Sequence, residues 1–325
     1  MEPGMELTEK QSATLVTPKK GKGKDSTDRP KVAEKPKHTI SLTEAVKIKE
    51  YNPDTKKLQA TRAYGKVNFQ TRPEETSSEY ARLDKETDTD NILELLQKDW
   101  KLTRPNLLLS VTGAAEEFNC ENRTRVFDSI VGAADSTDAW IITGGTNVGV
   151  MKYTGEAVKK HQDTTGKDVT TIGIATWGVV KESHRTKLTR TEKEIEDAKH
   201  KKKKDNSFIW ANLRGQKEKN SLGSYLPPKE LPDPNQTQSE EEGADLNPNH
   251  THFILVDSHV NNKFGGEIDL RSKLEGAISS NWREVNPKSS KGTEGTAPLN
   301  GNVNDAVSPE NPSTEGELLL IYRLA

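Results

Sequence analysis

The sequence has few of the residues that build a tightly packed globule. Of its 325 residues only 30% are hydrophobic and 5% are aromatic, and the mean hydropathy is −0.87. A single packed domain of this length needs a larger apolar fraction. We therefore predict an ordered core of roughly 100–200 residues, flanked by long solvated segments.

Cysteine is nearly absent as well, because Cys120 is the only one. A single cysteine excludes an intrachain disulfide and a metal site made of several cysteines, and it is typical of a reducing cytosol. His250 and His252 would lie on the same side of a strand, but no third ligand is near them in the sequence, which favours a structural role. We expect no metal and no resident cofactor.

Long apolar runs are missing too. No stretch approaches the about 20 consecutive apolar residues of a membrane-spanning helix, and the first residues lack the apolar core of a secretion signal. The 48 Lys and Arg residues nearly balance the 50 Asp and Glu residues, for a formal net charge of −2. Such a chain has no overall field that draws nucleic acid or membranes. We predict a cytosolic chain with no membrane span and no nucleic-acid partner.

Polar segments divide the chain into parts. Residues 1–61 have scattered Pro, Lys and Glu with almost no apolar periodicity, which predicts a disordered tail. Residues 62–104 form a predicted transition segment with a short edge strand at Val67–Phe69 and a helix leading to Trp100. Residues 283–325 are predicted to be a low-complexity tail that ends in an apolar run.

Between residues 105 and 282 the sequence alternates between strand and helix patterns. An amphipathic helical pattern follows the first, second and fourth of four apolar runs, which lie at residues 107–111, 139–142, 169–175 and 252–257. This alternation predicts an α/β domain with a Rossmann-like, doubly wound parallel sheet, incomplete at its C-terminus. Residues 187–249 are highly charged, and we expect them to form a long exposed insertion that is partly helical near residues 191–199.

Two glycine-containing turns follow predicted strands. The first is Thr112–Gly113, and the second comprises Gly144, Gly145 and Thr146, with Gly149 at the start of a helix. Glycines at such turns let an anion approach backbone N–H groups, and the helix dipole adds about half a positive charge. Glycines here also often serve only close packing, so the spacing alone leaves both functions open. Parallel strands bring the two turns to one edge, where α/β sheets bind ligands.

Five sequence blocks, in order, resemble the first homology regions of the melastatin-type TRP channels, the TRPM family. They are residues 105–113, 139–145, 149–151, 171–178 and 249–257. The resemblance is to the ADP-ribose-gated branch of that family. It implies a SLOG-type, Rossmann-like domain that is related to the LOG-type nucleotide hydrolases and is used as a ligand sensor.

The resemblance also implies which residues bind ADP-ribose or a related nucleotide. Carried over by position, the ligand would contact Thr112, Gly113, Gly144, Gly145, Thr146, Gly149 and Arg271. Arg271 is the candidate for a bidentate phosphate contact. The ADP-ribose-gated members place adjacent arginines where this chain has Glu182 and Ser183, and the nearby Arg185 is the residue that could replace them.

In function, the resemblance implies the cytosolic nucleotide-sensing module of a calcium-permeable, non-selective cation channel, here without the pore. Its partners would be the remaining domains or subunits of a tetrameric channel, at the cytoplasmic face of the plasma membrane. A freestanding regulator of channel subunits is an alternative with the same motifs. A LOG-like nucleotide phosphoribohydrolase would need a second glycine motif with a nearby acidic residue, and none follows Val256, so we expect no enzymatic activity.

Overall fold

The structure is a computed structural model of the chain. It describes residues 39–52, 56–71, 77–113, 122–205, 222, 226–234, 241–281 and 319–323. All of them belong to one unit that comprises His38–Ala325. Residues 1–38 of the predicted N-terminal tail, residues 283–318 of the predicted C-terminal tail and residues 206–221 of the predicted insertion lie outside the described residues.

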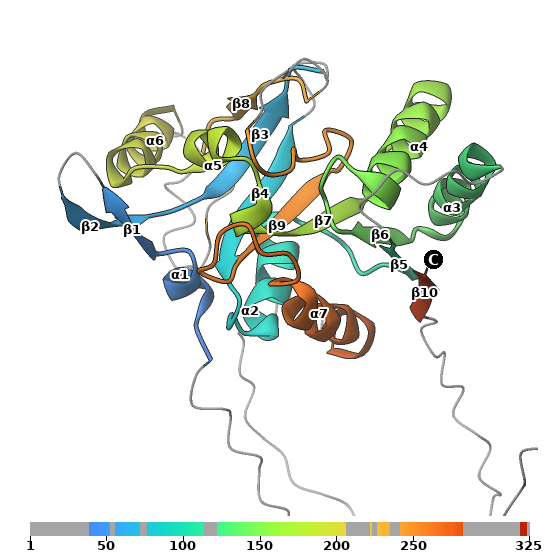
Figure 1. Cartoon of the computed structure of the whole chain (residues 1–325), viewed down its shortest axis with the longest axis horizontal. Helices are drawn as coiled ribbons and strands as arrows, with labels where there is room; N and C mark the ends of the chain where they lie inside the picture. Colours follow the sequence, from blue (N-terminus) through green and yellow to red (C-terminus); the bar gives the residue numbers. More distant parts are fainter. Residues whose placement is uncertain are drawn as a thin grey trace, which may run out of the picture. The chain divides into compact units, whose positions relative to one another are not determined.

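An eight-stranded sheet forms the middle layer of the domain (Figure 1). Each neighbouring pair of strands is parallel except β3 and β4, which are antiparallel. In spatial order the strands are β10 (Leu319–Arg323), β5 (Leu108–Thr112), β6 (Trp140–Thr143), β7 (Thr171–Thr176), β9 (His252–Asp257), β4 (Ser78–Asp84), β3 (Tyr64–Phe69) and β8 (Lys229–Leu231). The four predicted strands of the core are confirmed as β5, β6, β7 and β9, and so is the Rossmann-like α/β class.

Helices cover both faces of this sheet because its strands are apolar on both sides. In β5, Leu108 packs into the core under one face and Leu109 into the core under the other. Helices α3 (Arg123–Thr137) and α4 (Gly149–Thr165) cover one face (Figure 1). The other face packs against α2 (Thr89–Glu94), the adjoining η1 (Leu95–Asp99) and α7 (Ile268–Asn281).

Strand β4 is a central strand that the hydrophobic pattern does not reveal. It carries Glu79, Arg82 and Asp84 among its seven residues, and these charges interrupt the apolar run expected of a buried strand. It nevertheless lies between β9 and β3, with five of its residues buried on both sides of Arg82. The predicted transition segment therefore supplies two strands of the main sheet, and β3 is flanked by β8 instead of forming the edge.

The structure also places ordered elements in the segment that we predicted to be a disordered tail. A short helix α1 (Leu42–Ala45) precedes a hairpin of β1 (Ile48–Asn52) and β2 (Lys57–Thr61). Leu42 and Val46 are buried in the main core and attach this segment to the domain. Burial of a few apolar residues thus orders a stretch whose average composition is polar.

The flanks of the predicted insertion differ from a simple exposed loop. Helices α5 (Glu182–Leu188) and α6 (Glu192–Asp205) follow β7, and α6 corresponds to the helix expected near residues 191–199. Thr191 and Glu194 form a capping box, because the Glu194 N–H donates to Thr191 Oγ1 at 3.2 Å and the Thr191 N–H donates to Glu194 Oε2 at 2.8 Å. Leu188, Ile195 and Leu246 are buried, so both ends of this segment belong to the core.

Acid should destabilise this fold partly through His252. Its ring lies 4.9 Å from the Trp100 ring, and burial, with a contribution from Lys66, lowers the pKa of His252 to about 3. An unfolded histidine titrates near about 6.5, so between pH 6.5 and 3 the unfolded chain binds more protons and stability falls as pH falls. We expect His252→Phe, which keeps a ring there, to lose less stability than wild type between pH 7 and 5. Urea unfolding at both pH values measures this, and equal losses would contradict it.

Candidate functional site

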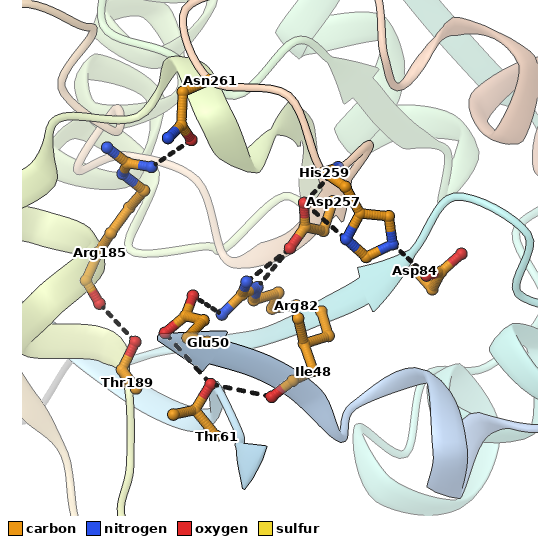
Figure 2. Close-up of polar contacts among 10 residues, drawn as sticks. All are labelled: Ile48, Glu50, Thr61, Arg82, Asp84, Arg185, Thr189, Asp257, His259 and Asn261. Carbon is orange, nitrogen blue, oxygen red and sulfur yellow. Dashed lines mark hydrogen bonds and ion pairs between the residues drawn. The ribbon is translucent and has the colours of Figure 1, made fainter. Parts of the chain in front are cut away.

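A polar pocket of 740 Å³ lies at the carboxyl ends of β4, β7 and β9 (Figure 2). Its volume is within the range of about 300–1,000 Å³ that is typical of small-molecule sites. The carboxyl edge is also where open α/β sheets bind ligands. Hairpin β1–β2, strand β4, helix α5 and the segments after β7 and β9 supply its lining: Ile48, Lys49, Glu50, Tyr51, Gln59, Thr61, Arg82, Trp177, Glu182, Arg185, Thr186, Thr189, Thr191, Asp257, His259 and Asn261.

Arg82 is the central charged group of this pocket. Its side chain is only 4% exposed, and its Nε and Nη2 donate to Asp257 Oδ2 at 3.0 and 2.5 Å. Its guanidinium carbon also lies 4.4 Å from the centre of the Trp177 ring. The third nitrogen, Nη1, lies 2.7 Å from Glu50 Oε1 on the hairpin. That contact is an ion pair without hydrogen-bond geometry, so Nη1 is the least satisfied donor of Arg82.

His259 connects the two aspartates that end β9 and β4. Asp257 and Asp84 are partners in the parallel register. The backbone N–H of His259 donates to Asp257 Oδ1 at 2.7 Å, and the ring Nε2 of His259 lies 2.7 Å from Asp84 Oδ2. Its backbone φ of 61° is in the left-handed region, where histidine is enriched. Within the described ranges no set of three or more His, Cys, Asp or Glu side chains is arranged to hold a metal ion.

Arg185 is the one predicted site residue that lines this pocket. It lies on α5, and its Nη1 donates to Asn261 Oδ1 at 2.8 Å (Figure 2). Its Nε is buried and has no hydrogen-bond partner among the described residues. Arg185 therefore keeps unused donor capacity beside the pocket.

The glycine turn after β6 is packed against its own chain. The Gly145 N–H donates to Thr143 Oγ1 at 2.9 Å, and its carbonyl accepts from the Asn247 N–H at 2.9 Å. Gly145 has φ +72°, and a Cβ on it would lie 2.8 Å from the Gly173 Cα in β7. The Asn147 N–H donates to the Asp245 carbonyl at 2.7 Å. Close packing therefore already accounts for glycine at position 145, and phosphate contact at this turn stays a prediction.

Arg271 is likewise engaged with its own chain. Its Nε donates to Glu275 Oε1 at 2.8 Å, and its Nη2 donates to Ser110 Oγ at 2.9 Å and to the carbonyls of Val111 and Ile142 at 3.3 Å. These contacts fix α7 to the carboxyl ends of β5 and β6. Thr112 is the next residue of β5, so the structure places it beside Arg271 at the same sheet edge.

The eight predicted residues therefore fall into two groups. Thr112, Gly113 and Arg271 lie at the ends of β5 and β6, together with the turn that contains Gly144, Gly145, Thr146 and Gly149. None of these seven lines the pocket under the hairpin, whereas Arg185 does. Residues 114–121, which follow Gly113, lie outside the described residues.

Sequence reasoning did not find three residues that shape the pocket. Glu50 lies in the segment that we predicted to be disordered, and Arg82 lies in the strand that we did not predict. His259 follows β9 without a motif around it. Asp257 had a usable signal, because an acidic residue that ends a buried strand needs a partner.

A mostly parallel sheet with a polar pocket at its carboxyl edge defines the class of Rossmann-like ligand-binding domains. A family model described as "SLOG in TRPM" matches residues 78–214 and 224–292. The chain belongs to this family, the SLOG domains of the TRPM channels. In the described part of the chain, the length and apolar character required to cross a bilayer do not occur together in any helix.

Curated relatives give the same assignment. The chain is 39% identical over 222 residues to "Transient receptor potential cation channel subfamily M member-like 2" of Nematostella vectensis, a match that spans 67% of this chain and 12% of that protein. It is 34% identical over 247 residues to subfamily M member 2 of Mus musculus, spanning 73% and 14%. It is 32% identical over 221 residues to subfamily M member 7 of Rattus norvegicus, spanning 67% and 10%.

Substitution of Gly145 should destabilise the fold through packing. Gly145→Ala places a Cβ against the Gly173 backbone, which we expect to cost roughly 1–3 kcal/mol beyond the backbone strain. Gly166→Ala is the matched control, because Gly166 has the same φ of +72° but nothing lies within 4 Å of the added Cβ. The control should lose only about 1–2 kcal/mol of strain. Urea unfolding compares the two variants, and equal losses would show that packing is not the cause.

The buried Arg82–Asp257 pair should behave as a unit. Arg82→Gln leaves the Asp257 carboxylate, whose side chain is 6% exposed, without its main partner, and we expect a loss of roughly 3–5 kcal/mol. Asp257→Asn should cost a similar amount. The double variant should lose clearly less than the sum of the two, as measured in a double-mutant cycle of unfolding free energies. Strict additivity would argue against a coupled pair.

Proposed function

We propose that this chain is the nucleotide-sensing part of the cytosolic regulatory region of a TRPM-family cation channel, and that it binds ADP-ribose or a related nucleotide without transforming it. Family membership and the polar pocket at the carboxyl edge of the sheet support this proposal together. The observation that carries it is Arg185, which has a buried, unsatisfied Nε in the wall of that pocket. A guanidinium with a free donor suits a phosphate oxygen.

The glycine turn and Arg271 are held by contacts within the chain. In this proposal they therefore stabilise the edge of the sheet next to the site. Gly145 holds its turn against β7, and Arg271 holds α7 against the ends of β5 and β6. Both arrangements fix the edge of the sheet in advance, which lowers the entropy that a ligand would lose on binding. In this proposal the residues that contact phosphate directly are on the α5 side of the edge.

The channel context is part of the same proposal. The chain spans 10–14% of the length of the curated relatives given above, whose names describe cation channels. We expect the remaining domains and subunits of a tetrameric, calcium-permeable channel to be its partners at the cytoplasmic face of the plasma membrane. Nucleotide binding to the sensing domain would then bias the channel equilibrium by its differential affinity for two states.

Calorimetric titration of the full chain with ADP-ribose tests the proposal. Saturable binding, with no adenine released during prolonged incubation, supports a sensor. Release of adenine, by hydrolysis of its N-glycosidic bond, would instead support the phosphoribohydrolase, and absence of binding would contradict the sensing function.

Charge reversal at Glu182 should strengthen nucleotide binding. Glu182 lines the pocket, at a position where the ADP-ribose-gated branch that this chain resembles has an arginine. Glu182→Arg removes a negative charge and adds a positive one near the ligand, so we expect affinity for ADP-ribose to rise roughly fivefold or more, less so at high salt. Glu196→Arg is the control, since Glu196 is an exposed α6 residue outside the pocket lining. Equal effects of both substitutions would indicate a general charge effect.

A further inference from the structure

The pocket is composite, because part of its wall comes from outside the matched family region. The family model begins at residue 78, whereas β1 and β2 comprise residues 48–52 and 57–61. That hairpin supplies six of the sixteen lining residues: Ile48, Lys49, Glu50, Tyr51, Gln59 and Thr61. The hairpin therefore adds chemistry to the site that the family assignment alone does not specify.

Glu50 covers the least satisfied nitrogen of Arg82 in this pocket. Its carboxylate lies against Arg82 Nη1, the donor that Asp257 leaves unused (Figure 2). The Glu50 side chain is 40% exposed, whereas Arg82 is 4% exposed. The carboxylate also accepts a hydrogen bond from Thr61 Oγ1 at 3.2 Å. A buried guanidinium is thus covered by a partly exposed carboxylate that is held by this one hydrogen bond and by the ion pair. A phosphate oxygen is an acceptor that could take the place of the carboxylate at Arg82 Nη1.

The charges around the pocket are balanced while Glu50 is in place. The lining contains three positive side chains and three negative ones, namely Lys49, Arg82 and Arg185 and Glu50, Glu182 and Asp257. Asp257 is fixed by its buried bonds to Arg82, and Glu50 is the carboxylate on the hairpin. Displacement of Glu50 would leave the remaining lining with a net positive charge, which favours an anion.

The strand register separates Glu50 from Tyr51. Ile48 pairs with Thr61 and Glu50 pairs with Gln59, and all four residues line the pocket. Successive side chains of a strand point to opposite faces, so Tyr51, which is 62% exposed and pairs with Leu58, points away from the side of Glu50. Glu50 is therefore the side chain of β1 that a ligand at Arg82 would meet.

We infer that a phosphorylated nucleoside binds beneath hairpin β1–β2, where its phosphate displaces Glu50 from Arg82 and also contacts Arg185. Glu50 acts as an internal competitor that sets the affinity. This inference rests on the proposed nucleotide-sensing function and assigns its ligand to one pocket.

Removal of the competing charge should tighten binding. In calorimetric titrations of the full chain, we expect Glu50→Gln to bind ADP-ribose roughly fivefold more tightly than wild type, in line with the loss of a partly exposed ion pair. Inorganic pyrophosphate should respond in the same direction, because it shares the phosphate contact. Glu86→Gln is the matched control: it removes an equally large charge from an exposed residue outside the pocket and should leave both affinities unchanged.

Tyr51→Ser is a second control, on the hairpin itself. Tyr51 follows Glu50 but points to the opposite face, with Leu58 as its cross-strand partner, so this substitution should leave the affinities for ADP-ribose and pyrophosphate unchanged. Thermal unfolding of each variant checks that the hairpin substitutions leave the domain folded.

The outcomes separate this inference from the function on which it rests. If wild type binds ADP-ribose but Glu50→Gln binds it with wild-type affinity, the nucleotide binds elsewhere, and the pocket assignment fails while the sensing function stands. If neither wild type nor Glu50→Gln binds ADP-ribose, both fail. Tighter binding by Glu50→Gln, but not by Glu86→Gln or Tyr51→Ser, supports the inference.

Discussion

The buried ion pair between Arg82 and Asp257 is the constraint on which the rest of the site depends. It joins two neighbouring parallel strands, β4 and β9, at the edge where the pocket lies. Either charge alone would be costly to bury, so each makes the other tolerable inside the sheet. Asp257 accepts hydrogen bonds from two of the three guanidinium nitrogens. The third nitrogen forms the ion pair with Glu50, which connects the β1–β2 hairpin to this buried pair.

Similar ties hold the rest of the carboxyl edge. Arg271 bonds to the ends of β5 and β6, and residues 245–247 run along the glycine turn after β6. Asn247 fits against Gly155, where a Cβ would lie 2.2 Å from its Oδ1. Polar groups at this edge are thus largely paired within the chain. Arg82 Nη1 and Arg185 Nε lack a hydrogen-bond partner among the described residues, which supports the proposal that a ligand binds on the α5 side.

The β1–β2 hairpin adds residues to the pocket lining from outside the matched family region. The matched region supplies six of the eight strands, together with Arg82, Asp257 and Arg185, whereas β1 supplies the Glu50 carboxylate. A carboxylate in an intramolecular contact has a high effective concentration, so under the inference drawn above a ligand has to displace it. Sequence changes in a short segment outside the family region would then set ligand affinity without altering the fold.

The sequence by itself determined the α/β class, the four apolar strands β5, β6, β7 and β9, and the helices after β5, β6 and β9, because their periodicity is local. It also identified the family through ordered blocks around Thr112, Gly144 and Thr176. Tertiary structure decided that the charged strand β4 is central, that residues of the polar strands β1 and β2 form part of a pocket wall, and that Gly145 and Arg271 are engaged by their own chain. The reason is physical: the partner that makes a buried charge acceptable can be distant in the chain, as Asp257 is from Arg82, and single-sequence periodicity contains no information about such pairs.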